Sequence, residues 1–86
     1  MRIIDYSKQA IKTLTELRKS GGKTSEQMRK ELLKIERNPM PSDVKKLKGH
    51  ELYRVRVGDF RIIYHFDETT IFVTIIDRRD VVYKNL

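Results

Sequence analysis

The dipeptide Gly58-Asp59 constrains the fold more than any other feature, because it fixes how the segments on either side of it pair. Residues 52–57 and 60–66 are rich in β-branched and aromatic side chains, a composition typical of β-strands. A two-residue loop that contains glycine joins such strands in a β-hairpin and sets their register. Residues 71–77 have the same composition and follow the loop 67–70, which predicts a three-stranded antiparallel meander.

This register gives the predicted meander two different faces, because successive side chains of a strand point to opposite sides of the sheet. With Val57 opposite Phe60, Arg56 lies opposite Arg61. The predicted core face carries Tyr53, Val55, Val57, Phe60, Ile62, Tyr64, Phe66, Ile71, Val73 and Ile75. The second face carries Leu52, Arg54, Arg56, Arg61, Ile63, His65, Phe72, Thr74, Ile76 and Arg78.

Basic residues gather on this second face. Like charges directly opposite each other on neighbouring strands destabilise a sheet by about a few tenths of a kcal/mol, so the fold alone does not favour the arrangement. Because arginine binds phosphate through a planar fork of donors, the face is predicted to bind an anion such as a nucleic-acid backbone. The alternative is that ordinary strand arginines lie over an apolar surface with their heads in water. The predicted basic strip consists of Arg54, Arg56, Arg61 and Arg78, extended by Lys45, Lys46 and Lys48.

Two amphipathic segments precede the meander and are predicted to form a helical hairpin that covers its core face. Ser7 is the expected N-cap of a first helix over residues 8–19, which Gly21-Gly22 ends. Thr24, with Gln27 three residues later, is the expected capping box of a second helix that Asn38-Pro39 ends. The expected buried stripes are Ala10, Ile11, Leu14 and Leu17 in the first helix and Met28, Leu32 and Ile35 in the second.

The remaining segments complete the expected fold. Residues 2–6 are a further strand candidate, and residues 38–50 are a predicted loop with one helical turn around 42–46. A chain of 86 residues is too short for two independent cores, so residues 1–86 are predicted to form a single domain. The expected fold class is therefore α+β, with an N-terminal strand, a helical hairpin and an antiparallel meander packed on the helices.

Composition narrows the class of partner and the compartment. The chain carries 19 Lys and Arg against 12 Asp and Glu, and its net charge of +7 favours a polyanionic partner, either nucleic acid or an acidic protein. It lacks cysteine, metal-binding spacings and cofactor motifs, so no metal and no cofactor are expected. The longest apolar run, residues 71–76, is too short for a membrane helix, and a cytoplasmic protein without a membrane partner is expected. The two histidines, His50 and His65, are expected at the surface.

Several segments resemble the RelE/ParE superfamily of toxins from toxin-antitoxin modules. They are Leu47-Lys48-Gly49, Leu52-Tyr53-Arg54-Val55-Arg56, Phe60-Arg61-Ile62-Ile63-Tyr64 and Asp77-Arg78-Arg79-Asp80-Val81-Val82-Tyr83. Together with the order of strand, two helices and meander, the resemblance covers nearly the whole chain and leans to the RelE branch. It implies a RelE-like fold and a ribosome-dependent mRNA endonuclease that inhibits translation. The implied partners are mRNA, the ribosome and a RelB-like antitoxin that holds the toxin inactive.

The resemblance also implies roles for individual residues in a metal-independent cleavage, in which a 2′-hydroxyl attacks the adjacent phosphate. Arg61 and Arg78 are expected to stabilise the transition state, because an arginine cluster supplies positive charge where negative charge develops. Arg54 and Arg56 are expected to clamp the RNA backbone and to donate a proton. Tyr83 is expected to stack on a base or to transfer a proton. The remaining RNA-binding candidates are Lys45, Lys46, Lys48 and Arg79.

Two other functions stay open. A ParE-like toxin binds DNA gyrase and leaves RNA intact, and the presence of Arg61, Arg78 and Tyr83 argues against that function. A toxin-like subunit with weak catalysis acts mainly in a repressor complex with its antitoxin. Two departures keep this interpretation open: Arg54 and Arg56 stand where members often carry lysine, and Asp77 stands where many relatives carry histidine.

The net charge also predicts how an antitoxin silences such a toxin. An acidic, partly disordered segment is expected to fold on the arginine-bearing face and to cover it or the Tyr83 terminus. The alternative is a partner that packs on the hydrophobic helical surface and leaves the arginines open.

Overall fold

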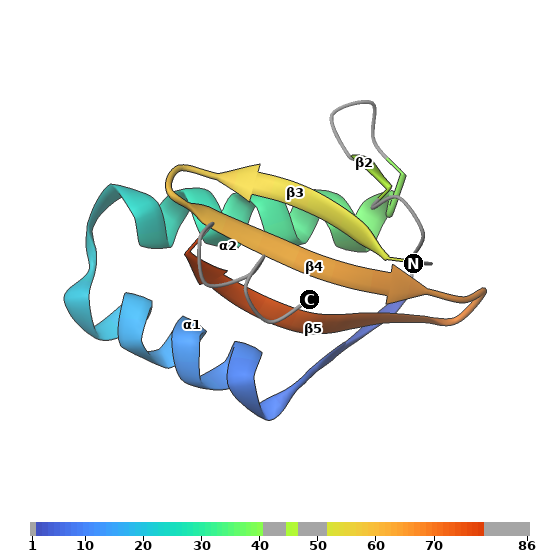
Figure 1. The fold of residues 1–86 in the computed structure, drawn as a ribbon, viewed down its shortest axis with the longest axis horizontal. Coiled ribbons are helices and arrows are strands. Elements are labelled where there is room, and N and C mark those ends of the chain that lie inside the picture. The colour runs from blue at the N-terminus through green and yellow to red at the C-terminus, as the bar shows by residue number, and fades with distance from the viewer. Residues whose placement is uncertain (1, 41–44, 47–51, 79–86) are drawn as a thin grey trace.

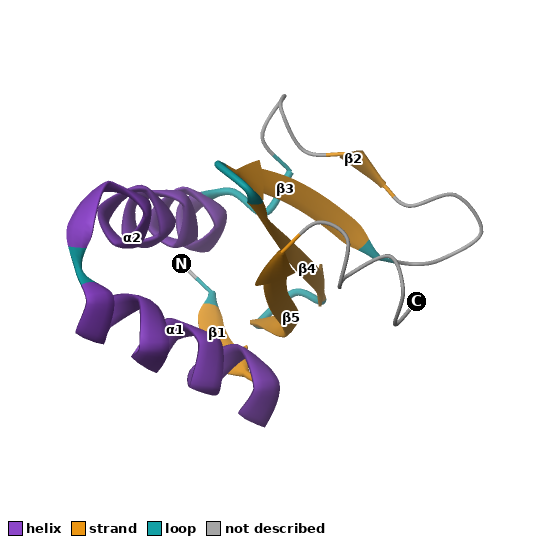
Figure 2. Ribbon diagram, turned by 60° about the vertical axis from the view of Figure 1, so that its left-hand side comes forward, coloured by secondary structure: helices purple, strands orange, loops and turns teal. Residues whose placement is uncertain are grey.

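A computed structural model describes residues 2–40, 45–46 and 52–78 of the chain. Two helices cover one face of a five-stranded sheet, and Figure 2 shows both of them on the same side of the strands. None of the helices in the described part of the chain is long and apolar enough to cross a membrane. The elements are β1 (Ile3–Tyr6), α1 (Lys8–Ser20), α2 (Gly22–Arg37), β2 (Lys45–Lys46), β3 (Tyr53–Val57), β4 (Phe60–Phe66) and β5 (Thr70–Arg78). The predicted α+β class is confirmed.

The sheet has the strand order β1-β5-β4-β3-β2. β3, β4 and β5 form the predicted antiparallel meander, and β1 adds to it in parallel beside β5 (Figure 1). The predicted helical turn around 42–46 is wrong at its end, since Lys45 and Lys46 form a short strand against Arg54 and Tyr53. The backbone groups along the edge of β3 find hydrogen-bonding partners in this way.

The first helix begins at the predicted residue and ends one residue later than predicted, at Ser20. The Ser7 hydroxyl accepts a hydrogen bond from the Ala10 amide at 3.0 Å, which caps the start of α1. Gly21, with a positive φ of 67°, follows the helix and donates its amide to the Leu17 carbonyl. The predicted capping box is wrong, because α2 already begins at Gly22 and Thr24 lies inside it. A single glycine with a left-handed backbone therefore separates the helices, and no polar side chain caps α2.

The core lies between the helices and the sheet. The predicted stripe of α2 is confirmed, since Met28, Leu32 and Ile35 are all buried. In α1 the buried position is Ala10, with Leu14 and Leu17 partly buried beside it, whereas Ile11 is 52% exposed. The prediction for Ile11 is wrong, because one residue of helix turns the side chain by about 100° from the face that Ala10 directs at the sheet. The sheet contributes Val55, Val57, Ile62, Tyr64, Ile71, Val73 and Ile76.

Tyr64 joins the core to the segment that leaves α2. Its side chain is fully buried in the middle of the sheet, beside the rings of Tyr53 and Phe66. Its hydroxyl donates a hydrogen bond to the Pro39 carbonyl at 2.6 Å. A buried hydroxyl costs free energy unless it is paired, so this bond both satisfies the phenol and anchors the chain just after α2.

We predict that Tyr64→Phe lowers the free energy of unfolding by about 1–2 kcal/mol, because it removes this buried bond and leaves the Pro39 carbonyl without the phenol. Urea denaturation followed by circular dichroism measures the change. Tyr53→Phe is the matched control, since Tyr53 belongs to the same ring cluster but is only half-buried. Equal losses for the two variants would contradict the anchoring role.

Asp67 organises the loop between β4 and β5. One of its carboxylate oxygens accepts hydrogen bonds from the Thr69 amide at 2.9 Å and the Thr70 amide at 2.8 Å. The Thr69 hydroxyl donates to the same oxygen at 3.2 Å. The two amides, Thr69 first, favour the ionised form and lower the pKa of the Asp67 carboxyl. The charged carboxylate therefore stabilises this turn.

The lowered pKa predicts a pH-dependent contribution to stability. Because the folded-state pKa lies below the unfolded value of about 3.9, the contribution is complete above that value and is lost as the pH falls through the folded-state pKa. Asp67→Asn keeps an acceptor oxygen but cannot titrate, so its stability should fall less than that of the wild type in acid. Denaturation curves recorded at a series of pH values test this, with Asp59→Asn as the control. An unchanged pH profile in Asp67→Asn would overturn the interpretation.

Candidate nucleic-acid interface

The hairpin of β3 and β4 has the register that Gly58-Asp59 predicts. Arg56 pairs with Arg61, and Arg54 pairs with Ile63. Val55, Val57 and Ile62 are buried in the core under the helices, so the arginines between them lie on the opposite side of the sheet. We call this surface, formed by Arg54, Arg56 and Arg61, the arginine face.

The three side chains of the arginine face differ in exposure. Arg56 is exposed, Arg54 is half-buried, and Arg61 is only 8% exposed. The Arg56 Nε donates to the Gly58 carbonyl at 3.2 Å, and an Arg61 guanidinium nitrogen donates to the Phe60 carbonyl at 3.3 Å. Both bonds hold charged side chains beside the hairpin turn. Cross-strand neighbours have Cβ atoms about 4.5–5.5 Å apart, so positive charge is concentrated at this end of the sheet.

The short strand β2 pairs with β3, the strand that carries Arg54 and Arg56. In the backbone register Lys45 stands next to Arg54, and Lys46 stands next to Tyr53. The other predicted site residues, Lys48, Arg79 and Tyr83, lie outside the described residues, as does His50. The backbone of Lys45 thus lies beside that of Arg54, and the RNA-binding role of the lysines stays a prediction.

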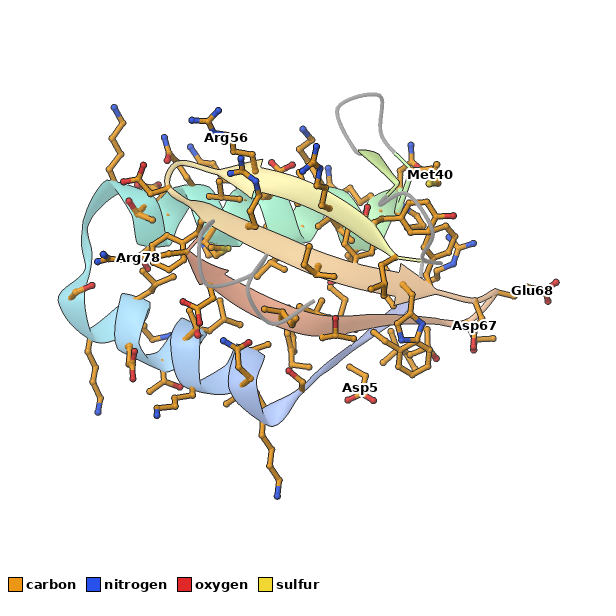
Figure 3. All side chains as sticks on the ribbon, viewed as in Figure 1. Asp5, Met40, Arg56, Asp67, Glu68 and Arg78 are labelled. Atoms are coloured by element: carbon orange, nitrogen blue, oxygen red, sulfur yellow. The ribbon has the colours of Figure 1, made fainter. Side chains whose placement is uncertain are left out.

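Arg78 does not share the arginine face, and this part of the prediction is wrong. β5 pairs with β4 as predicted at Phe66 and Ile71, but a β-bulge leaves Thr74 without a partner residue. An extra residue reverses the alternation of faces beyond it. Arg78 is consequently opposite Phe60, on the side of the helices. In Figure 3, Arg56 points upward from β3 and Arg78 points to the left from the end of β5.

The same bulge changes the positions of the residues just before Arg78. Ile76 is buried in the core, where the uninterrupted alternation had placed Ile75. Asp77 is the cross-strand partner of Arg61. Sequence reasoning noted Asp77 only as a departure from relatives and missed that its position adjoins Arg61.

The bulge forms where β1 gives way to α1. The Ser7 amide donates to the Val73 carbonyl at 2.9 Å, and its hydroxyl donates to the Thr74 carbonyl at 2.6 Å. On the other side of β5, the Thr74 hydroxyl donates to the Ile63 carbonyl at 3.1 Å. These bonds provide hydrogen-bonding partners for backbone groups near the interruption in the pairing of β4 with β5.

His65 lies at the far end of β4 from the hairpin turn. It is half-buried, and its ring stacks on Phe72 with centroids 4.7 Å apart and planes 17° apart. Its expected surface position is thus only partly correct, and its ring is engaged in packing. Among the described residues, no three His, Cys, Asp or Glu side chains gather closely enough to hold a metal ion.

A second surface feature lies on the helical side. A groove of about 520 Å³ runs between α1, α2 and β1, with an apolar floor and a charged rim. Burial, and to a smaller extent Glu36, raises the pKa of the Tyr6 phenol, which borders this groove. The apolar lining consists of Ile4, Leu14, Leu17, Met28, Leu32 and Leu33, and the charged rim consists of Arg18, Glu26, Arg29 and Glu36.

Comparison with known proteins shows to which family the chain belongs. A family model described as the ParE toxin of the type II toxin-antitoxin system parDE matches residues 4–82. The chain is 38% identical over 89 residues to the RelE1 protein of Methanocaldococcus jannaschii, an alignment that covers 95% of this chain and 94% of RelE1.

Solved structures with the same fold include toxins bound to antitoxins. The archaeal RelE-RelB complex from Pyrococcus horikoshii OT3 is similar with a TM-score of 0.71 and 28% identity, covering 91% of this chain and 94% of that chain. A RelB-RelE antitoxin-toxin complex from Methanococcus jannaschii is similar with a TM-score of 0.71 and 24% identity, covering 94% of this chain and 96% of that chain. A YafQ mutant from E. coli is similar with a TM-score of 0.76 and 17% identity, covering 96% of this chain and 99% of that chain. The last two are similar in fold alone.

Proposed function

This chain belongs to the ParE toxin family of type II toxin-antitoxin systems, within the RelE/ParE superfamily, and we propose that it arrests growth by cutting mRNA on the translating ribosome. The observation that supports this activity best is the arginine face, where Arg56 and Arg61 are cross-strand neighbours and Arg54 follows along the strand. Like charges so placed favour a phosphate between them, because the anion offsets their repulsion. One face of a single small domain does not enclose an RNA chain, so the ribosome is proposed to present the substrate.

The proposed reaction needs positive charge more than any other group. The 2′-hydroxyl loses its proton and attacks the adjacent phosphorus, the bond from phosphorus to the 5′-oxygen breaks, and that oxygen gains a proton. The products are a 2′,3′-cyclic phosphate and a 5′-hydroxyl. Arg61, whose side chain is nearly buried, is proposed to stabilise the pentavalent transition state, since a charge held away from water acts strongly. Arg54 and Arg56 are proposed to clamp the RNA backbone and to protonate the leaving oxygen.

The remaining predicted residues take supporting roles in this proposal. Arg78 ends β5 at the same end of the sheet as Arg61 but on the other face, so we propose that it acts from the rim. Tyr83 is proposed to stack on a base or to transfer a proton. The RNA-binding residues are proposed to be Lys45, Lys46, Lys48 and Arg79.

The proposed regulator is a RelB-like antitoxin. The similarity to the RelE of a RelE-RelB complex supports such a partner, and the net charge of +7 favours an acidic one. The arginine face and the apolar groove between the helices are its two candidate contact surfaces. We propose that the inhibitory contact covers the arginine face, because that contact blocks phosphate binding directly.

A second candidate function is inhibition of DNA gyrase. The match to the ParE family model favours it, as does the position of Arg78 away from the arginine face. A ParE-like toxin of this kind binds gyrase and leaves mRNA intact.

Mapping the 5′ ends of cellular mRNA after induction separates these functions. We expect new 5′ ends within translated regions, which disappear when translation is blocked beforehand. Plasmid supercoiling is measured in the same cells. Loss of supercoiling with intact mRNA would establish the gyrase function instead, and cleavage that persists without ribosomes would indicate a ribonuclease that acts on unbound RNA.

Because Arg61 and Arg78 lie on different sides of the sheet, their removal should lower the cleavage rate by different factors. Arg61→Ala should lower the single-turnover cleavage rate on programmed ribosomes by about 10²–10³-fold, because it removes a charge at the scissile phosphate. Arg78→Ala should cost about tenfold, as expected for a rim contact. Arg37→Ala, an exposed arginine at the end of α2, is the control and should leave the rate unchanged. Cleavage that is equally fast in Arg61→Ala would remove the arginine face from the active site.

A further inference from the structure

The outer edge of β5 is held by side chains of α1 beyond the point where β1 ends. The parallel pairing stops at Tyr6 and Val73, and Ser7 then contacts the carbonyls of Val73 and Thr74. Gln9, in the first turn of α1, continues this edge. Its amide oxygen accepts the Ile76 amide at 2.9 Å, and its amide nitrogen donates to the Ile76 carbonyl at 2.9 Å. Gln9 therefore pairs with Ile76 as a strand residue would.

Gln9 also contacts the side chain of Asp77. Its amide nitrogen lies 3.2 Å from one Asp77 carboxylate oxygen and 3.2 Å from the Thr13 hydroxyl oxygen. The other Asp77 oxygen accepts the Arg78 backbone amide at 2.8 Å. Both oxygens of the carboxylate are thus bonded at the edge of β5, and neither of these bonds is to Arg61.

The register places Asp77 where a carboxylate would interfere with phosphate binding. Asp77 is the cross-strand neighbour of Arg61, and opposite charges at this spacing attract each other. A carboxylate turned onto the arginine face would offset its positive charge and repel an approaching phosphate. The contact with Gln9 draws the carboxylate the other way, toward α1.

We propose that Gln9 is a positioning residue for the arginine face, because it holds the Asp77 carboxylate at the edge of β5 and out of the phosphate-binding surface. This role rests on the proposed function, since it matters only if Arg54, Arg56 and Arg61 bind RNA phosphate. Gln9 acts through Asp77 and touches no reacting atom.

Two substitutions of Gln9 test the role. Gln9→Met keeps the size of the side chain and removes every hydrogen bond. Gln9→Glu keeps an acceptor for the Ile76 amide but sets a second carboxylate against Asp77. An acidic residue in the first turn favours a helix, so Gln9→Glu is expected to keep α1 folded even if Gln9→Met does not. Gln27→Glu and Gln27→Met, at an exposed position of α2, are matched controls for charge and size.

We expect both Gln9 variants, when folded, to cleave programmed mRNA about tenfold more slowly than the wild type, less than the loss expected for removing Arg61 itself. The decisive readout is rescue. Asp77→Asn should restore cleavage in either Gln9 variant to about the rate of Asp77→Asn alone, because the residues act as a coupled pair. A merely structural role for Gln9 predicts no rescue, and that result would overturn the proposal, as would unchanged cleavage in the Gln9 variants.

Amide hydrogen exchange tests the local contact independently of any activity. The Ile76 amide, which donates to Gln9, should exchange faster in Gln9→Met and stay protected in Gln9→Glu. Unchanged exchange in Gln9→Met would overturn the contact on which the proposal depends. Cleavage of mRNA on programmed ribosomes is measured for the wild-type protein in the same experiment as for the variants. If the wild type does not cleave, the proposed function fails and the role of Gln9 fails with it. If the wild type cleaves and the Gln9 variants match it, only the role of Gln9 fails.

Discussion

The parallel pairing of β1 with β5 is the interaction on which the rest of the structure depends. It places β5 between two strands, so that the end of the described chain is anchored by its beginning. It also fixes where α1 starts, because the chain leaves β1 at Ser7, whose hydroxyl both caps the helix and bonds to Thr74. The bulge at Thr74, which sets the cross-strand partners of Asp77 and Arg78, lies directly after the point at which this pairing stops.

Local patterns in the sequence predict most of the fold. The two-residue turn at Gly58-Asp59 leaves the hairpin one register, so the positions of Arg56 and Arg61 follow from counting residues. The stripe of α2 is equally direct, because Met28, Leu32 and Ile35 recur at helical spacing and all are buried. In both cases the information lies within one element or one short turn.

The errors arise where the structure depends on contacts between distant residues. Nothing in residues 71–77 marks a bulge, since the groups that stabilise it include Ser7, far away in the chain. Uninterrupted alternation therefore placed Arg78 on the wrong face. Thr24 and Gln27 fit a capping box by composition, yet the positive φ of Gly21 starts α2 earlier. Lys45 and Lys46 join the sheet because β3 offers an unpaired edge, which a local reading of residues 38–50 does not reveal.

Close to the hairpin turn, β4 directs different kinds of side chain to the two sides of the sheet. The buried residues Ile62 and Tyr64 of β4 pack toward the helices and stabilise the fold. Arg61, the second residue of β4, places its charge on the opposite side of the sheet. Adjacent arginines weaken the sheet by about a few tenths of a kcal/mol. A fully buried Ile or Leu side chain contributes about 1.5–3 kcal/mol, so the core easily offsets this repulsion. The fold can therefore carry adjacent arginines at little cost, and their proposed binding of phosphate requires that acidic neighbours such as Asp77 be held away from them.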